Sequence, residues 1–177
     1  MRIGSCTLCK GEARVEALPH GDASEIECAR CGKFAITDTV LTFLRAGLAE
    51  DEDNRLLPYL SAHTRQETEK GGRVLLTTNW RDVARPHADT PVSEKAIKLL
   101  KLIAASSSQP GAPVKINVML DAPLVDAASV GAFNFLLDYL RRSDHVRHEG
   151  GTLYCLTASG WEHLGRLLVD RSTHDGQ

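Results

Sequence analysis

Four cysteines near the start of the chain constrain its fold more than any other feature. Cys6 and Cys9 form one C-x2-C pair, and Cys28 and Cys31 form a second pair shortly afterwards. Two such pairs, separated by about fifteen to twenty residues, match the pattern of a tetrahedral four-thiolate zinc site. Gly32 follows the second pair directly, where a residue without Cβ allows a tight turn around the metal. The sequence therefore predicts one zinc ion bound by all four cysteines.

Other uses of the cysteine pairs fit the sequence less well. Two disulfides would require an oxidising compartment, but residues 1–5 lack the apolar stretch of a secretory signal. A redox C-x-x-C pair usually stands alone beside a βαβ unit, whereas both pairs here lie in a segment with strand-like patterns. Four thiolates leave no open coordination position, so the ion cannot activate water or polarise a substrate. We therefore expect the zinc to be structural.

Composition and charge exclude several classes of protein. The 177 residues are 42% hydrophobic and 25% charged, which fits a globular α+β protein rather than a disordered or fibrous one. No stretch approaches the roughly 18 apolar residues of a membrane-spanning helix, so we expect a cytoplasmic protein without membrane contact. The formal net charge is −2, and four thiolates with one Zn²⁺ would add about two negative charges. This acidity counts against a general polyanion binder.

The segment around the cysteines predicts a zinc ribbon that docks on helices. Residues 12–18 alternate in the two-residue period of a half-exposed strand, and residues 33–36 leave the second cysteine pair as a further strand. Thr37 then precedes a helix whose apolar positions cover one broad face. We expect this face to pack against the ribbon.

A second helix follows, with Pro58 expected in its first turn. Its later part, residues 63–70, is polar on most faces, which is typical of a solvated surface. His63 and Arg65 lie there beside an apolar stripe, and we treat them as candidate contacts to a partner.

A polar, proline-marked connection over residues 84–90 predicts a boundary. The expected division is a zinc ribbon with a helical extension over 1–84, a second domain over 91–170, and a polar tail or linker over 171–177. One zinc-bearing layer joined to a second lobe is the alternative arrangement.

The order of elements after the boundary is that of a winged helix: a helix that opens with Pro91, a strand over 114–118, another helix, and a hairpin turning at Gly150-Gly151. The segment 153–161 resembles the last wing strand and the following helix of bacterial winged-helix proteins. This resemblance implies a fold in which the helix before the hairpin can enter the DNA major groove.

Two features of this domain argue against sequence recognition in the major groove of DNA. No helix is expected between Val118 and Asp126, which makes the helix-turn-helix pair degenerate. The next helix, which Asp126 is expected to cap, is not basic on its outward face. The candidate contacts to nucleic acid or to a protein partner are at its end and in the hairpin: Arg141, Arg142, Arg147 and His148.

Further motifs extend over the whole chain: the two cysteine pairs, the continuation from Gly32 to Thr37, the helix from Leu60 to Gly71, and the phrase Leu156–Trp161. With these motifs the chain resembles the N-terminal region of a group of bacterial proteins in which a four-cysteine ribbon and a winged-helix-like segment precede a catalytic domain. That domain is TIR-like or similar to nucleoside 2-deoxyribosyltransferases. The resemblance implies a regulatory part of a nucleotide-processing defence effector, whose catalytic domain would begin near Gln177.

No set of residues in the sequence predicts catalysis. A nucleophile with a paired base, a glycine-rich phosphate loop and a metal site with an open position are all missing from its motifs, and Cys155 is expected to be a core residue. We therefore expect a non-catalytic zinc-binding regulatory, sensor or protein-interaction module that binds a protein or a small nucleotide. The alternative is a DNA-binding transcriptional regulator; the oligomeric state is left open.

Overall fold

The chain forms two compact units of mixed helix and sheet. The computed structural model describes residues 2–19, 21–46 and 51–174. The first unit comprises Met1–Thr90 with Met119–Ser129, and the second comprises Pro91–Val118 with Val130–Gln177. The α+β class predicted from the sequence is confirmed.

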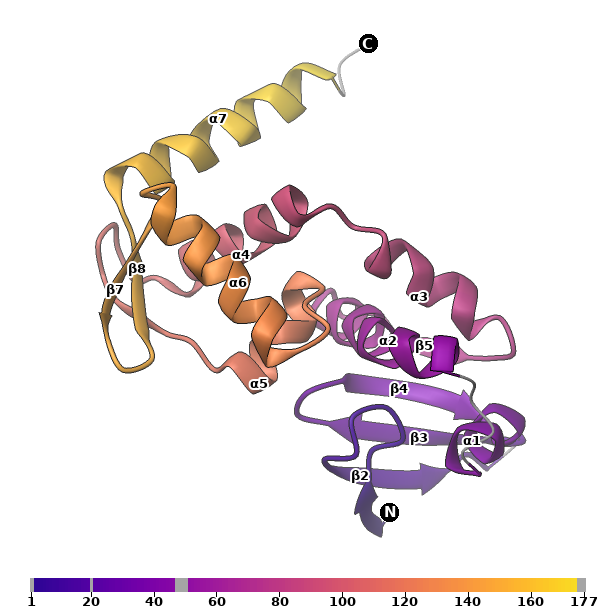
Figure 1. Cartoon of the computed structure of the whole chain (residues 1–177). Helices are drawn as coiled ribbons and strands as arrows, with labels where there is room; N and C mark the ends of the chain where they lie inside the picture. Colours follow the sequence, from indigo (N-terminus) through magenta and orange to yellow (C-terminus); the bar gives the residue numbers. More distant parts are fainter. Residues whose placement is uncertain (1, 20, 47–50, 175–177) are drawn as a thin grey trace. The chain divides into compact units, whose positions relative to one another are not determined.

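The first unit is built on a five-stranded sheet with the strand order β1-β2-β3-β4-β5 (Figure 1). Its strands are β1 (Arg2–Ser5), β2 (Glu12–Ala17), β3 (Ala23–Cys28), β4 (Gly32–Thr37) and β5 (Val74–Leu76). The first four pair antiparallel in sequence order, whereas β5 joins β4 in parallel. Val15 and Ile26 are buried while Arg14 and Glu27 are exposed, so one face of the sheet meets the core. Both cysteine pairs lie at or beside the turns between strands.

Helices complete the first unit. They are α1 (Asp38–Arg45), α2 (Asp51–Glu69), α3 (Trp80–Ala88), α5 (Val118–Asp121) and the 3₁₀ helix η1 (Ala122–Val125). Leu56 and Leu60 of α2 pack with Trp80 and Ala84 of α3 in the core that also holds three of the cysteines. Because α2 already begins at Asp51, Pro58 lies inside it rather than in its first turn, and the acidic residues 51–53 occupy that turn instead.

The connection expected over residues 84–90 is largely helical, which corrects the sequence-based interpretation. Helix α3 continues to Ala88, and Ala84 is fully buried in the core. Burial of the apolar face of α3 stabilises this helix by more than the missing backbone N–H of Pro86 destabilises it. The first unit consequently extends to Thr90 rather than ending at residue 84.

Residues 119–129 are a second correction. They lie within the expected domain 91–170, yet they belong to the first unit. They also form the helices α5 and η1, where no helix was predicted. Asp126 does not cap the following helix: it has a left-handed backbone with φ of 55°, it closes η1, and it is buried. Its carboxylate is held by partners in the first unit, which explains why the next helix starts only at Val130.

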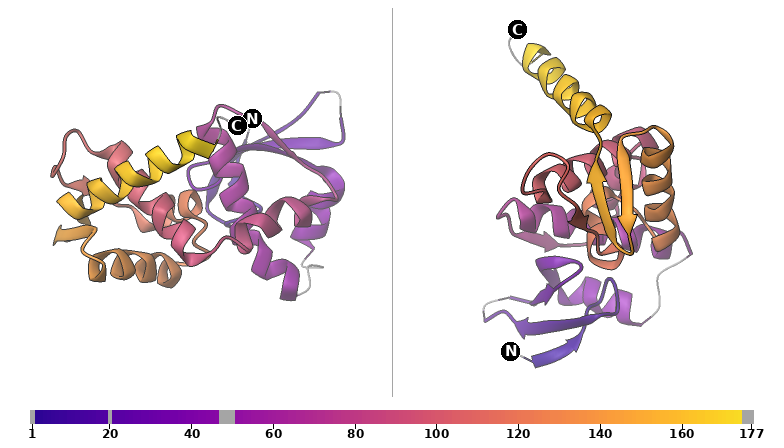
Figure 2. Two further views of the ribbon diagram at one scale, coloured as in Figure 1. Left: turned by 90° about the horizontal axis from the view of Figure 1, so that it is seen from above. Right: turned by 90° about the vertical axis from the view of Figure 1, so that its left-hand side faces the viewer.

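The second unit combines three longer helices with a three-stranded sheet of order β6-β8-β7. Its elements are α4 (Val92–Ser106), β6 (Val114–Lys115), α6 (Val130–Arg142), β7 (Val146–Gly150), β8 (Leu153–Leu156) and α7 (Ala158–His174). The β7–β8 hairpin lies beside α6 (Figure 2). Gly150 and Gly151 both have positive φ, which confirms the turn predicted there. Helix α7 continues to His174, so the expected polar tail over 171–177 is helical in its first part.

The core of the second unit is formed by the inner faces of its helices. It includes Leu99, Ile103, Phe133, Leu137, Leu140 and Leu164. Cys155 is buried as expected, and burial raises the pKa of its thiol.

Within the described part of the chain, no single helix is long and apolar enough to cross a membrane; only the bent pair Val118–Val125 and Val130–Arg142 meets that test jointly.

Candidate metal centre

The four cysteines converge on one point of the first unit. Their sulfur atoms all lie within 4.8 Å of one another, with Cys6, Cys28 and Cys31 buried and Cys9 partly buried. Cys6 Sγ is 3.7 Å from Cys31 Sγ, and Cys9 Sγ is 3.5 Å from Cys28 Sγ. Metal–sulfur bonds of about 2.3 Å in tetrahedral geometry place neighbouring sulfurs about 3.8 Å apart. The group predicted from the spacing can therefore hold one metal ion.

Two turns with similar backbone conformations carry the four sulfur atoms. In the first, the backbone N–H of Cys6 donates to Gly11 O at 2.7 Å, and that of Lys10 donates to Cys6 O at 2.9 Å. Lys10 has φ of 63°, and Gly32, which follows the second pair at the same position, has φ of 76°. Each turn thus reverses direction with a left-handed residue directly after its second cysteine.

Gly32 is required for a second reason that the sequence did not reveal. A Cβ atom at this position would lie 2.3 Å from Thr68 Oγ1 of α2 and 3.2 Å from Thr64 O. The second turn therefore sits directly on helix α2, with no room for a side chain between them.

Polar residues of α2 support the second turn. The Ser61 hydroxyl lies 3.1 Å from Cys31 Sγ, and both groups are buried. Thr68 Oγ1 accepts a hydrogen bond from the backbone N–H of Lys33 at 2.9 Å. Hydrogen bonds from neighbouring groups orient metal ligands and stabilise their negative charge. The polar half of α2 is thus a docking surface for the turn, not the solvated surface expected from its composition.

Arg65 belongs to the same support. Its guanidinium donates to the carbonyl of Ala29 within the second turn and pairs with Glu69 at 2.8 Å. This predicted contact residue therefore faces its own chain. Sequence reasoning missed Ser61 and Thr68, which support the same turn. They share a helix face with Arg65, because the three residues are spaced three to four positions apart. This spacing was the signal in the sequence that could have identified them.

The thiols shift one another's ionisation strongly. A hydrogen bond from Cys31 lowers the pKa of Cys28, and the same contact raises the pKa of Cys31, which burial raises further. A divalent cation would supply the positive charge that four neighbouring thiolates, three of them buried, need.

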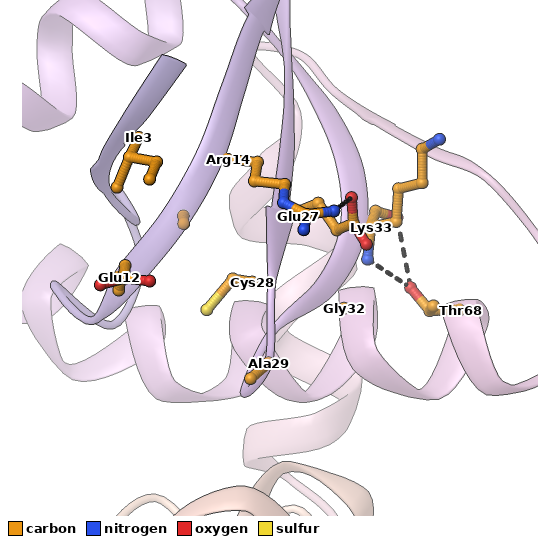
Figure 3. A pocket seen from close by; sticks show the side chains of 10 residues that line it. Ile3, Glu12, Arg14, Glu27, Cys28, Ala29, Gly32, Lys33 and Thr68 are labelled. Atoms are coloured by element: carbon orange, nitrogen blue, oxygen red, sulfur yellow. Dashed lines mark hydrogen bonds and ion pairs between the residues drawn. The ribbon is translucent and has the colours of Figure 1, made fainter. Parts of the chain in front are cut away.

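A groove of about 480 Å³ borders the metal centre (Figure 3). Cys28 lines it together with charged side chains of the sheet, among which Arg14 and Glu27 form an ion pair at 3.7 Å. Glu12 and Lys33 line it as well, so the groove carries charges of both signs. The groove therefore offers a mixed polar surface beside the metal centre.

The remaining predicted contact residues lie in two places. Arg141, Arg142, Arg147 and His148 all line one groove of about 590 Å³ in the second unit, between the end of α6 and β7. Two of them are paired with acidic groups: Arg141 with Asp138 at 3.0 Å and Arg147 with Glu149 at 2.5 Å. His63 instead turns toward α3, where it contacts His87.

Comparison with known proteins found no matching family model, no matching curated protein and no matching solved structure. The function is therefore proposed below from the geometry of this chain and from the resemblance carried by its sequence motifs.

Proposed function

We propose that the first unit is a zinc ribbon in which Cys6, Cys9, Cys28 and Cys31 bind one structural Zn²⁺. The sulfur–sulfur distances match a tetrahedral thiolate site, and soft sulfur ligands favour this ion in such a geometry. All four positions are taken by protein, so the ion holds the turns together and performs no chemistry on a substrate.

We further propose that the chain is a non-catalytic regulatory module that binds a protein. Along the chain, the elements after Thr90 follow the order expected of a winged helix, from α4 and β6 to α6 and the β7–β8 hairpin, although α5 and η1, which precede α6, belong to the first unit. The observation that carries this proposal is the outward face of α6. Phe135 is 57% exposed and Tyr139 is 42% exposed there, and such apolar side chains suit a protein interface better than the polar base edges of DNA.

Affinity capture with the zinc-loaded chain tests this proposal. Phe135→Asp combined with Tyr139→Asp should abolish the capture of a partner protein, because a charged residue cannot be buried in an apolar interface without cost. Ile3→Asp is the matched control, since Ile3 is an exposed apolar residue of the first unit. If the double variant and the control capture the same proteins, or if the unaltered chain captures none, the proposal is wrong.

A DNA-binding regulator is the second candidate. The observation in its favour is that Arg141, Arg142, Arg147 and His148 line one groove beside the hairpin. The charge of this groove argues against DNA binding, because Asp138 and Glu149 already pair with two of the arginines. Fluorescence anisotropy with duplex DNA at several salt concentrations separates the candidates. Tight binding with a log–log salt slope of about −0.9 per phosphate contact, reduced by Arg141→Ala and Arg147→Ala, would favour DNA.

The regulatory role itself is proposed from the sequence resemblance. Bacterial proteins with a similar N-terminal region carry a TIR-like or deoxyribosyltransferase-like domain, so we propose that the module controls a cytoplasmic nucleotide-processing effector in defence against phage. The same anisotropy assay with fluorescent nucleotides tests a small nucleotide as its ligand.

A further inference from the structure

The second unit contains a cavity of about 210 Å³ that shares no lining residue with the two larger grooves. Helix α4 packs against both α6 and α7 there, and every residue that lines the cavity belongs to this unit. A water molecule occupies about 30 Å³ of liquid, so the cavity has the volume of about seven waters. Pockets for drug-sized ligands start at about 300 Å³. The cavity therefore suits a small organic molecule rather than a nucleotide.

The inner wall of the cavity is apolar. Ala96 and Leu100 of α4 line it together with Leu140 of α6, and each of these side chains is buried. Transfer of an apolar surface from water to such a wall is favourable. The body of a ligand in this cavity should accordingly be apolar.

The mouth of the cavity is polar. Ser93, Tyr139 and Ser143 line it as exposed residues, and His145 and His163 line it as half-buried ones. No acidic side chain is among the described residues that line this cavity, whereas glutamate or aspartate lines each of the two larger grooves. The mouth thus offers hydroxyl and imidazole donors, and two of its side chains can carry a positive charge.

The two histidines form one side of the mouth. Their rings are stacked, with centroids 4.6 Å apart and planes inclined by 10°. His145 Nδ1 lies 3.2 Å from the hydroxyl of Ser159. Within the described part of the chain, Nε2 of His145 and both ring nitrogens of His163 have no hydrogen-bond partner. Their capacity for hydrogen bonds is available to a ligand.

The position of His145 is fixed by its backbone. Its N–H donates to Leu140 O at 2.9 Å, and its carbonyl accepts from the backbone N–H of Thr157 at 3.1 Å. The first turn of α7 sits directly on this carbonyl, because a Cβ at Gly160 would lie 2.2 Å from it. The mouth is therefore formed before any ligand arrives, which lowers the entropic cost of binding.

We propose that this cavity binds a small monocarboxylic acid with an apolar body. The carboxylate accepts hydrogen bonds from His145 and His163 at the mouth, and the body lies against Leu100 and Leu140. Charge-assisted hydrogen bonds of this kind are stronger than neutral ones. The site does not depend on the functions proposed above. Because Tyr139 also belongs to the proposed protein interface, the test leaves that residue unchanged.

Titration of the zinc-loaded chain with benzoate tests the proposal. Calorimetry should show saturable binding with a dissociation constant of about 1 mM or below. In protein labelled with ¹⁵N-histidine, benzoate should shift the imidazole resonances of His145 and His163. Benzamide, which has the same ring without the charge, should bind at least roughly 10-fold more weakly, and His163→Gln should weaken benzoate binding about 10–100-fold. His148→Gln is the matched control, because His148 is an exposed histidine that lines a different groove.

Any of four results would overturn the proposal. These are no saturable binding of benzoate, equal affinity for benzamide, shifts at His148 rather than at the stacked pair, or equal benzoate affinity in His163→Gln and the unaltered protein. Ala96→Leu should also block binding, because the larger side chain fills the inner wall. Thermal denaturation establishes that each variant is folded. The comparison of benzoate with benzamide and the histidine shifts need only the unaltered protein, so they decide the question if a variant unfolds.

Discussion

At the scale of single residues, Gly32 is subject to two separable constraints. Its φ of 76° strains any L-residue, and a Cβ would collide with Thr68. Gly71 has the same φ but nothing within 4 Å of a Cβ. We expect Gly71→Ala to cost about 1 kcal/mol of stability from the backbone alone, and Gly32→Ala to cost about 2–4 kcal/mol because the contact with α2 is also lost.

Denaturant unfolding of the zinc-loaded protein measures both variants. Thr68→Ala should recover part of the loss in Gly32→Ala, because it removes the hydroxyl that the new methyl group meets. Equal destabilisation at the two glycines would mean that only the backbone conformation matters.

His145 predicts a pH dependence of the second unit. Burial lowers the pKa of its imidazole below the ordinary 6.5, and the stacked ring of His163, with centroids 4.6 Å apart, and Arg166 lower it further, whereas Asp144 opposes them. A histidine with a lowered pKa stabilises the fold fully above pH 6.5 and loses that contribution as the pH falls toward the folded-state value. We therefore expect thermal stability of the unaltered protein to fall more steeply from pH 7 to 5 than that of His145→Gln. Parallel curves would contradict this.

At the scale of elements, helix α2 organises the first unit. One of its faces supports the metal turn through Ser61, Arg65 and Thr68, while Gln66 donates to Pro123 O of η1 at 2.9 Å. Ser61→Ala removes the hydroxyl beside Cys31, and we expect a roughly 10–100-fold loss of zinc affinity in competition with a chelator. Ser108→Ala, at an exposed serine, should change nothing. Unchanged affinity in Ser61→Ala would show that the hydroxyl does not orient the ligand.

The elements of the two units differ in how well the sequence predicted them. The cysteine group, the helix after Thr37 and the glycine turn of the hairpin depend on local spacing and turn chemistry, and they were predicted. The place of residues 119–129 depends on contacts distant in sequence, such as that of Arg30 with Met119 O at 2.5 Å. No local pattern encodes those pairs. The polar stretch of α2 was misinterpreted for the same reason, because composition does not reveal that a polar turn lies against it.

At the scale of the whole molecule, the metal should stabilise one unit far more than the other. The thiolates belong to the core of the first unit, which also contains the buried Trp80, whereas Trp161 lies in the second unit. Structural zinc contributes its binding energy directly to folding, so chelation should unfold the unit that holds it. The two tryptophans of the chain can report on the two units separately.

Fluorescence of single-tryptophan variants makes this prediction measurable. In Trp161→Phe, a strong zinc chelator should shift the emission of Trp80 to longer wavelength, because unfolding exposes an indole that is only 2% exposed in the native state. Cys31→Ser should show the shifted emission without chelator. In Trp80→Phe, Trp161 should keep its emission on chelation, since the second unit has its own helical core. An unchanged Trp80 spectrum in the metal-free protein would mean that packing alone holds the first unit together and that the thiolate site does not stabilise it.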